Sequence, residues 1–200
     1  NRVLNRYLWL NGAAENIDGC ALLPLLMSIR AAIRAKVALS TARLEGPKKA
    51  DEDIAAARRY FAQAQTFLIP TEPTLVAIGG LSGSGKTTVA AALAPDIGRA
   101  PGALHLRSDI ERKLLMRVGE TDRLPASAYA PEVGDAVYER LRDKTGRALG
   151  AGASVVVDAV HGRPDEREAI AAVAAEQGVS FVGIWLEAPA ATLLSRVSTR

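Results

Sequence analysis

A glycine-rich run near the middle of the chain carries the strongest chemical signal in the sequence. Residues 80–87 are GLSGSGKT, a full match to the pattern G-x-x-x-x-G-K-[ST]. The strand-like segment TLVAI precedes this run, and the helix-like segment KTTVAAAL follows it. Glycines let the backbone curl so that successive N–H groups point inward, and the positive end of the following helix faces the same space. The run therefore predicts a site for the phosphates of a nucleotide.

The members of this predicted loop have separate roles. Lys86 is expected to reach the β- and γ-phosphates, and the Thr87 hydroxyl is expected to ligate Mg²⁺. The residues predicted to contact the nucleotide are Gly80, Ser82, Gly83, Ser84, Gly85, Lys86, Thr87 and Thr88. The alternative is a glycine-rich turn that binds nothing, which the agreement between motif and context disfavours. The motif indicates a nucleotide but not what the nucleotide is used for.

Two carboxylates stand where predicted strands end, on the rim where open parallel sheets bind ligands. Asp158 closes the segment SVVVD and is predicted to hold Mg²⁺ directly or through water. Its alternative is a surface aspartate after a strand. Asp109 follows ALHLRS and precedes a predicted helix. A carboxylate there can orient and deprotonate an acceptor hydroxyl, and its alternative role is the N-cap or first-turn acid of that helix.

Arginines near these carboxylates and on the last predicted helix are candidates for binding phosphate oxygens, because their planar, permanently charged groups suit that task. They are Arg112, Arg163, Arg167, Arg196 and Arg200. Arg112 lies one helical turn after Asp109, whereas Arg163 and Arg167 lie just past the strand-end aspartate. For each arginine alone, a solvated or salt-bridged surface position is at least as good an interpretation. The set as a whole favours a functional cleft.

Other polar residues are weaker candidates. His161 could act as a base, but its loop position favours a surface histidine. His105 lies within a strand and Tyr138 within a helix, and both are predicted to pack rather than react. Cys20 begins an apolar helix and is predicted to be buried. One cysteine and two histidines exclude an internal disulfide and a zinc set.

The elements that must position these residues alternate between strands and helices after Pro73. Strands are predicted at residues 74–78, 103–106, 154–157 and 180–186. Helices are predicted at residues 86–93, 110–118, 132–149, 167–177 and 190–200. This order is typical of a parallel sheet with crossover helices. The three consecutive valines at 155–157 are what a strand covered on both faces should carry.

Two further helices are predicted earlier in the chain, at residues 20–44 and 51–68. The first has apolar residues at helical spacing on one broad face, and the second repeats Ile54, Phe61 and Leu68 every seven residues. Together they predict a helical hairpin with apolar faces to bury. The chain therefore divides into a helical segment, residues 1–69, and an α/β domain, residues 70–200.

The composition fits a soluble globular protein. Of 200 residues, 48% are hydrophobic and 24% are charged, which excludes a disordered chain. The net charge of +3 is too mild, and too evenly spread, to favour nucleic acid as a partner. The longest apolar run, residues 21–29, is well short of the roughly 20 residues that cross a bilayer, and no signal peptide is visible. We therefore expect a cytoplasmic protein with no membrane partner.

The ends of the chain predict a fragment of a longer protein. The chain opens at Asn1 without a methionine. It closes at Arg200, inside a predicted helix that has no stop signal. Further elements are therefore expected on both sides of this sequence.

Taken together, these motifs resemble small P-loop kinases of the gluconate kinase and zeta-toxin type. The resemblance covers about residues 74–200 and rests on GGLSGSGKTT, RSD-x-x-RK, ALGAGASVVVDA, RP-x-x-R and WLEAP-x-x-x-L-x-x-R-x-x-x-R. More closely, the chain looks like the C-terminal ATP-binding domain of fused bacterial proteins described as bifunctional aminoglycoside phosphotransferase/ATP-binding proteins. The segments NRYLWLNG and ALLPLLMSIRAAIRAKV then look like the closing helices of their phosphotransferase-like domain.

This resemblance implies a P-loop NTPase fold, in which a three-layer α/β/α arrangement surrounds a parallel sheet in the kinase-type order 2-3-1-4-5. It implies that the last strand and the rest of the lid are missing after Arg200. ATP and Mg²⁺ would bind at residues 80–88, and Asp109 and Arg112 would face the acceptor. The two arginines of the last helix would lie at the edge of a mobile lid. His161 departs from the pattern, because relatives commonly have an aromatic residue there.

Three functions follow as hypotheses. The first is an ATP-dependent kinase that transfers the γ-phosphoryl group to a hydroxyl of an unknown small molecule, with Lys86, Asp109 and Arg112 as its catalytic residues. Its substrate-facing residues would be Asp109, Arg112, Arg163 and Arg167. The second is a regulatory ATP-binding module that senses nucleotide for a fused phosphotransferase-like neighbour. The third is a polynucleotide kinase, which the even spread of charge disfavours.

Overall fold

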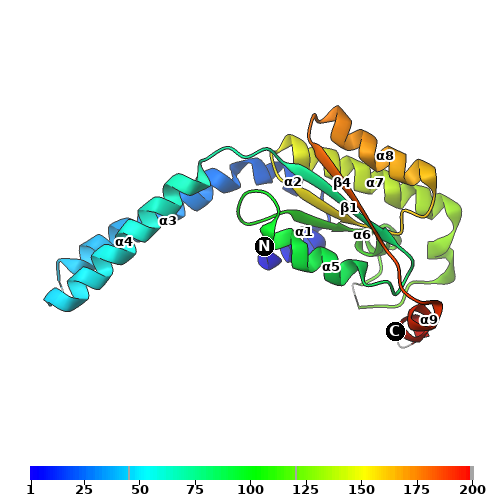
Figure 1. Ribbon diagram of the computed structural model, residues 1–200, viewed down its shortest axis with the longest axis horizontal. Helices are drawn as coiled ribbons and strands as arrows, with labels where there is room; N and C mark the ends of the chain where they lie inside the picture. Colours follow the sequence, from blue (N-terminus) through cyan, green and yellow to red (C-terminus); the bar gives the residue numbers. More distant parts are fainter. Residues whose placement is uncertain (45, 120, 199–200) are drawn as a thin grey trace. The chain divides into compact units, whose positions relative to one another are not determined.

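Four parallel strands form one sheet in the computed structural model, which describes residues 1–44, 46–119 and 121–198 (Figure 1). The strands are β1 (Thr74–Gly80), β2 (Leu104–Arg107), β3 (Val155–Asp158) and β4 (Ser180–Leu186). Their spatial order is β2-β3-β1-β4, and each neighbouring pair is parallel. This order confirms the predicted P-loop arrangement for the four strands that the chain supplies.

Helices cover both faces of this sheet. The helices that follow β1 along the chain are α5 (Lys86–Leu93), α6 (Ser108–Met116), α7 (Pro131–Gly150), α8 (Pro164–Glu176) and α9 (Ala190–Ser198), with 3-10 turns η2 (Ala94–Asp96) and η3 (Ala126–Tyr129). On one face, Val76 and Ile78 of β1 pack against Ala90 of α5. On the other face lie α7 and α8 (Figure 1). The predicted three-layer α/β/α architecture is therefore confirmed.

The helices α6 and α8 begin two and three residues earlier than the sequence predicted. α6 starts at Ser108, directly after the extended Arg107, so that Asp109 occupies its second position. α8 starts at Pro164, because the backbone N–H of Arg163 donates to the Glu166 carboxylate at 3.2 Å and proline suits a first helical position. The helix α6 therefore begins after the carboxyl end of β2, and α8 begins after the carboxyl end of β3.

The side chains at the centre of the sheet are fully buried. β1 lies between β3 and β4, and Leu75 of β1 pairs in register with Val155 of β3. Both side chains are 0% exposed, as are Val156 and Val157. A strand with apolar residues at every position is stable only when both of its faces are covered, which is what the helices on either side achieve.

Truncation of Leu75 in this centre tests the predicted core. Leu75→Ala should lower the free energy of unfolding by about 3 kcal/mol, because the cavity it leaves cannot close between two layers of helices. Leu10→Ala is the control, since Leu10 is 65% exposed and should change stability by less than about 0.5 kcal/mol. Urea unfolding followed by circular dichroism measures both values. Equal losses in the two variants would contradict this description of the core.

The chain forms two compact units that do not coincide with the predicted parts 1–69 and 70–200. One unit contains Asn1–Cys20 together with Glu72–Arg200, and the other contains Ala21–Thr71. The short helices α1 (Arg2–Asn11) and α2 (Glu15–Asp18), followed by the turn η1 (Gly19–Leu22), precede the second unit. Side chains of α1 hydrogen-bond to β2, so the first 20 residues belong with the sheet.

The second unit is the predicted helical hairpin, made of α3 (Leu23–Ala42) and α4 (Pro47–Phe67). Its buried positions are mainly small residues: Ser28, Ala31, Ala35, Ala42, Ala57 and Ala64. The predicted apolar face of the first helix is not covered, because Leu25, Ile29 and Val37 are each about half exposed. None of the helices described in the structure combines the length and the apolarity needed to cross a membrane.

Candidate functional site

The glycine-rich loop lies between the end of β1 and the start of α5. Gly80, Gly83 and Gly85 all have positive φ angles, of 138°, 84° and 96°. A side chain on Gly80 would collide with the carbonyl oxygen of Leu186, so glycine is required there for space as well as for conformation. A Cβ atom on Gly85 would meet no atom within 4 Å, which leaves the N-terminus of α5 open. The predicted loop therefore has the curled backbone that phosphate binding needs.

Lys86 folds back over this loop. Its Nζ donates to the carbonyl oxygens of Gly80 at 2.7 Å and Leu81 at 2.9 Å. The Ser84 hydroxyl oxygen is buried, and among the described residues it has no hydrogen-bond partner. A lysine held at the loop mouth and an orphaned buried hydroxyl fit the phosphate chain of a nucleotide, whose oxygens accept hydrogen bonds.

Thr87 and Asp158 meet at the carboxyl edge of the sheet. The Thr87 hydroxyl donates to Asp158 Oδ2 at 2.6 Å, and the aspartate is 4% exposed. These are the two residues that the sequence predicted as Mg²⁺ ligands, and the fold brings their oxygens together. The described residues contain no cluster of three or more acidic, histidine or cysteine ligands. Two protein oxygens suit Mg²⁺ bound with a nucleotide, since this ion usually keeps several waters and binds phosphate oxygens as well.

Cationic and polar groups surround Asp158 below the loop. His105 Nε2 lies 3.6 Å and Arg107 Nε lies 3.9 Å from its Oδ2. Burial alone would raise the pKa of this carboxyl, but its contacts with His105 and Thr87 and the charge of Arg107 outweigh burial and lower the pKa below its usual value. Asp158 is therefore ionised at neutral pH, as a metal ligand must be.

Asp109 and Arg112 lie on α6, which leaves the same edge of the sheet. Asp109 is exposed in the first turn of this helix, two residues beyond Arg107, which pairs in register with Asp158. Arg112 donates to the Ala128 carbonyl oxygen at 2.6 Å, and its guanidinium carbon lies 5.4 Å from the centre of the Tyr129 ring. This arginine therefore holds the turn η3 beside α6. Its predicted contact with an acceptor, like that of Asp109, remains a prediction.

Arg163 and Arg167 differ in their surroundings. The exposed Arg163 forms ion pairs with Asp135 at 3.0 Å, Glu166 at 3.1 Å and Asp165 at 3.4 Å, which is the salt-bridged surface alternative. Arg167 donates from Nη1 to the carbonyl oxygens of residues 161 and 162, both at 2.9 Å. It therefore braces the loop that follows Asp158. These contacts do not test whether Arg163 and Arg167 bind substrate, so that role stays a prediction.

The last helix reaches the nucleotide loop. Arg196 of α9 donates from Nη1 to the carbonyl oxygen of Gly83 at 3.1 Å. This contact brings one of the two predicted lid arginines to the loop. Arg200, the other one, lies outside the described residues. The last turn of α9 that the structure describes is therefore beside the loop where the sequence predicted nucleotide binding.

The prediction of a surface position for His161 is wrong, because only 3% of this residue is exposed. Its backbone N–H donates to the Tyr138 hydroxyl at 2.9 Å, and the two rings meet edge to face at 5.6 Å. Neither ring nitrogen has a hydrogen-bond partner among the described residues. Burial lowers the pKa of His161 to about 4 and raises that of Tyr138 to about 12. Tyr138 packs as predicted, and no sequence signal showed that it would cover the loop of His161.

The buried His161 makes stability depend on pH. Its pKa falls from 6.5 in the unfolded chain to about 4 in the folded protein, so the unfolded chain binds more protons between these values. The contribution to stability is full above pH 6.5 and is lost as the pH falls towards 4. Urea unfolding should show a loss of about 2 to 3 kcal/mol between pH 7 and pH 4.5 that is absent from His161→Phe. The same pH dependence in both proteins would disprove burial of this imidazole.

Sequence reasoning missed two residues at this edge, Arg107 and Trp9. The Arg107 guanidinium carbon lies 5.2 Å from the centre of the Trp9 ring. The strand-end argument that selected Asp158 applies equally to Arg107 and could have found it. Nothing in the local sequence indicates that Trp9, almost one hundred residues earlier, would lie against it.

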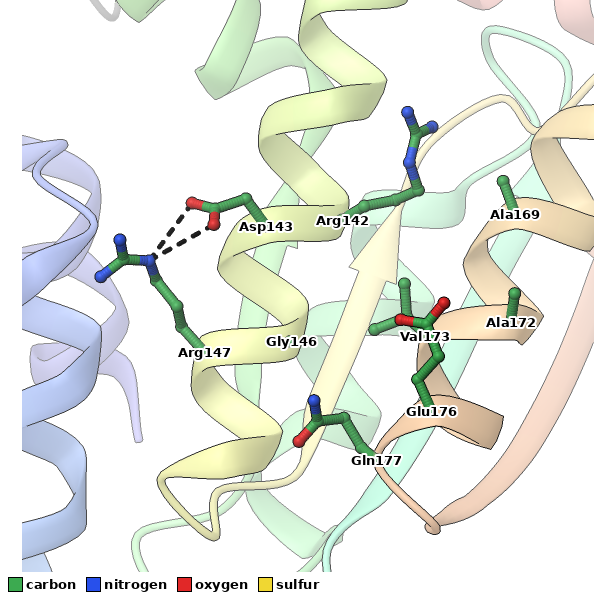
Figure 2. A pocket seen from close by; sticks show the side chains of 9 residues that line it. All are labelled: Arg142, Asp143, Gly146, Arg147, Ala169, Ala172, Val173, Glu176 and Gln177. Carbon is green, nitrogen blue, oxygen red and sulfur yellow. Dashed lines mark hydrogen bonds and ion pairs between the residues drawn. The ribbon is translucent and has the colours of Figure 1, made fainter.

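A groove on the surface of α7 and α8 is separate from this site. The groove has a volume of about 520 Å³. Its lining includes the small residues Gly146 of α7 and Ala169 and Ala172 of α8, which Figure 2 labels. Arg147 at one side is already paired with Asp143, through Nε at 3.3 Å. No residue of the nucleotide loop or of the carboxylate pair lines this groove. It therefore adds nothing to the candidate site.

Comparisons with known proteins agree with this geometry. The model of a family described as AAA domain matches residues 75–200, which include the whole glycine-rich loop. Uncharacterized proteins from two strains of Mycobacterium tuberculosis and one of Mycobacterium bovis are 27% identical over 177 residues, which make up 87% of this chain and 34% of each relative. The chain thus spans about a third of the length of the curated relatives it matches. With a P-loop between β1 and α5 and a family match over more than half of its residues, the chain belongs to this AAA domain family of P-loop nucleotide-binding proteins.

Proposed function

We propose that residues 70–200 form an ATP-binding kinase domain, which transfers the γ-phosphoryl group of ATP to a hydroxyl group of a small molecule. The observation that carries the proposal is the pairing of Thr87 with Asp158 at 2.6 Å, directly below the loop over which Lys86 is folded. A loop, a lysine, a hydroxyl and a carboxylate in this arrangement are the parts that phosphoryl transfer requires on the nucleotide side.

On the nucleotide side, the chain would bind and orient the phosphates. The backbone N–H groups of the loop and the Lys86 ammonium group would donate to phosphate oxygens, while Arg196 would close over the loop from α9. Thr87 and Asp158 would hold Mg²⁺, which when bound supplies positive charge against the phosphate oxygens. Most of the rate enhancement would then come from positioning and charge stabilisation.

On the acceptor side, Asp109 would act as the general base. Its carboxylate would take the proton from the acceptor hydroxyl as that oxygen forms its bond to the γ-phosphorus. The bond from the γ-phosphorus to the bridging oxygen would break, and ADP would leave with the electron pair. Arg112, Arg163 and Arg167 would orient the acceptor. The carbonyl and carboxylate contacts that these three arginines make now would have to be exchanged for contacts with substrate.

The setting of this domain in a longer protein is part of the same proposal. The relatives are about three times as long as the stretch they share with this chain. We propose that residues 1–69 correspond to the end of a phosphotransferase-like domain fused to the kinase domain, as the resemblance to aminoglycoside phosphotransferase/ATP-binding proteins implies, with residues 1–20 packed on the sheet of the kinase domain. A cytoplasmic location of the whole protein stays a prediction from the sequence.

A nucleotide-sensing module without transferase activity is the second candidate. The observation that favours it is the engagement of the acceptor-side arginines: Arg112 is bonded to the turn η3, and Arg163 is surrounded by three carboxylates. Such a domain would change the activity of its fused neighbour when ATP binds, and no phosphorylated product would form. A polynucleotide kinase comes third, and binding of oligonucleotides that weakens steeply with salt would favour it.

A product screen separates the first two candidates. The full-length protein would be incubated with ATP, Mg²⁺ and pooled metabolites that include sugars and aminoglycosides, and analysed by mass spectrometry. One new species heavier by a phosphoryl group, absent when Lys86→Ala replaces the native protein, supports the kinase. ATP binding without any such species supports the sensor. A product that persists in the Lys86→Ala protein would assign the transfer to another part of the molecule.

A further inference from the structure

The outer edge of β2 is covered by side chains of α1. β2 is an edge strand of the sheet, so one side of its backbone has no neighbouring strand within the described residues. Asn5 accepts a hydrogen bond from the backbone N–H of His105 at 2.7 Å and donates to the carbonyl oxygen of Ala103 at 3.3 Å. The Trp9 indole N–H donates to the carbonyl oxygen of His105 at 2.9 Å. Side chains of helix α1 therefore make the hydrogen bonds with β2 that a neighbouring strand would otherwise make, and these bonds fix the position of α1 along β2.

This anchoring places the Trp9 ring against two side chains of β2. The ring meets the His105 imidazole edge to face, with the centres 5.8 Å apart. The guanidinium carbon of Arg107 lies 5.2 Å from the ring centre, a distance at which a cation is attracted by an aromatic face. An arginine side chain has many conformations, and this contact restricts them. Trp9 therefore fixes the direction of the Arg107 side chain at the carboxyl end of β2.

Arg107 is held there without a full set of partners. Its Nε atom is buried and has no hydrogen-bond partner among the described residues. The carboxylate closest to it, Asp158, lies 3.9 Å away and already accepts a hydrogen bond from Thr87. A buried donor that is left without a partner is costly, so native proteins rarely keep one without a purpose. The side chain is only 20% exposed, at the edge of the sheet where the nucleotide loop opens.

We propose that Arg107 binds a phosphate oxyanion at this edge, and that Trp9 is the residue that positions it. The proposal rests on the nucleotide site described above and adds a further cation to it. The oxyanion is either the γ-phosphate of ATP or a separate phosphate group beside bound ADP, because Arg107 pairs in register with Asp158 rather than lying in the loop itself. Trp9 precedes the residues that the family model matches, so this positioning device comes from outside the matched segment.

The first experiment measures binding with Arg107→Gln. Calorimetry gives the affinities for ATP and ADP with Mg²⁺, and for inorganic phosphate added to the ADP complex. A loss of about tenfold or more for ATP, with ADP within about twofold of the native protein, assigns the oxyanion to the γ-phosphate. A similar loss for inorganic phosphate alone assigns it to a separate phosphate group. Native affinities for all three ligands, or equal losses for ATP and ADP, would overturn the proposal.

The second experiment tests the positioning role with Trp9→Leu, which removes the aromatic ring. For the ligand whose binding Arg107→Gln weakens, we expect Trp9→Leu to bind about threefold to tenfold more weakly than the native protein. The double variant should bind no more weakly than Arg107→Gln alone. Trp9→Phe, which keeps a ring but not the indole N–H, should retain most of the affinity even if Trp9→Leu folds poorly. Tyr7→Leu, on the exposed part of the same helix, is the matched control and should bind as the native protein does.

The positioning role would be overturned if the losses of affinity in Trp9→Leu and Arg107→Gln added up in the double variant. It would also be overturned if Trp9→Leu bound with native affinity. Melting temperatures of each variant, measured without nucleotide, show whether any loss reflects unfolding. A native protein that binds neither ATP nor ADP would instead overturn the proposed function itself. The failure of the inference and the failure of the proposed function are therefore distinguishable.

Discussion

Replacing Lys86 with alanine should weaken the binding of ATP with Mg²⁺ by about 100-fold, the largest effect expected of any single change in the nucleotide loop. The Lys86 ammonium group lies within 2.9 Å of two loop carbonyl oxygens, so it is already at the place where the phosphates would enter. Alanine removes both the positive charge and the hydrogen-bond donors. Calorimetric titration with ATP and Mg²⁺ measures the change.

The control for this prediction is Lys48→Ala. Lys48 is exposed near the start of α4, in the other compact unit of the chain, so its replacement makes the same change in net charge. It should leave the affinity for ATP within about twofold of the native value, because Lys48 is an exposed residue outside the glycine-rich loop. The nucleotide site would be misassigned if Lys86→Ala and Lys48→Ala bound ATP equally well.

Asp109→Asn should slow phosphorylation of the acceptor by about 1,000-fold while the affinity for ATP stays within about twofold. Asparagine keeps the shape of the side chain but cannot take the proton of the acceptor hydroxyl. Because Asp109 stands on α6 rather than on the loop, the nucleotide contacts are retained. The rate would be measured on the full-length protein, with the acceptor that the product screen identifies.

The chain offers a matched control for this change in Asp165→Asn. Asp165 occupies the second position of α8, as Asp109 does in α6, and both helices follow a strand of the same sheet. Each carboxylate therefore lies at the positive end of its helix, and Asp165 also pairs with Arg163 at 3.4 Å. If the only role of Asp109 were that of a first-turn acid, the two variants would lose activity and stability alike. Normal transfer by Asp109→Asn would leave the general base unidentified.

The sequence predicted well those elements whose cause is local. α5 has the predicted bounds, Lys86–Leu93, because the glycines before it and the alanines within it specify a loop and then a helix. β4 has the predicted bounds because its apolar run is flanked by a glycine before and a proline after it. The same local logic placed Thr87 at the start of the helix after the loop and Asp158 at the end of a strand, and a parallel sheet brings these two positions to one edge.

The features that the sequence could not show depend on residues far apart in the chain. Asn5 and Trp9 contact β2 across about a hundred residues, so neither periodicity nor a motif marks them. His161 is buried because Tyr138, on a different element, covers its loop. The spacing of the apolar residues in α3 predicts a helix, but it does not show that alanines form the contact with α4.

Because α1 covers the edge of β2, its position limits where a shortened, recombinant form of the nucleotide-binding domain can begin. A clone beginning at the proline connector would discard Asn5 and Trp9 and leave three backbone groups of Ala103 and His105 facing solvent. Exposed strand edges of this kind recruit strands from other molecules. Expression of a shorter version should therefore retain the first twenty residues, with the intervening hairpin as the natural place for trimming or for inserting a reporter.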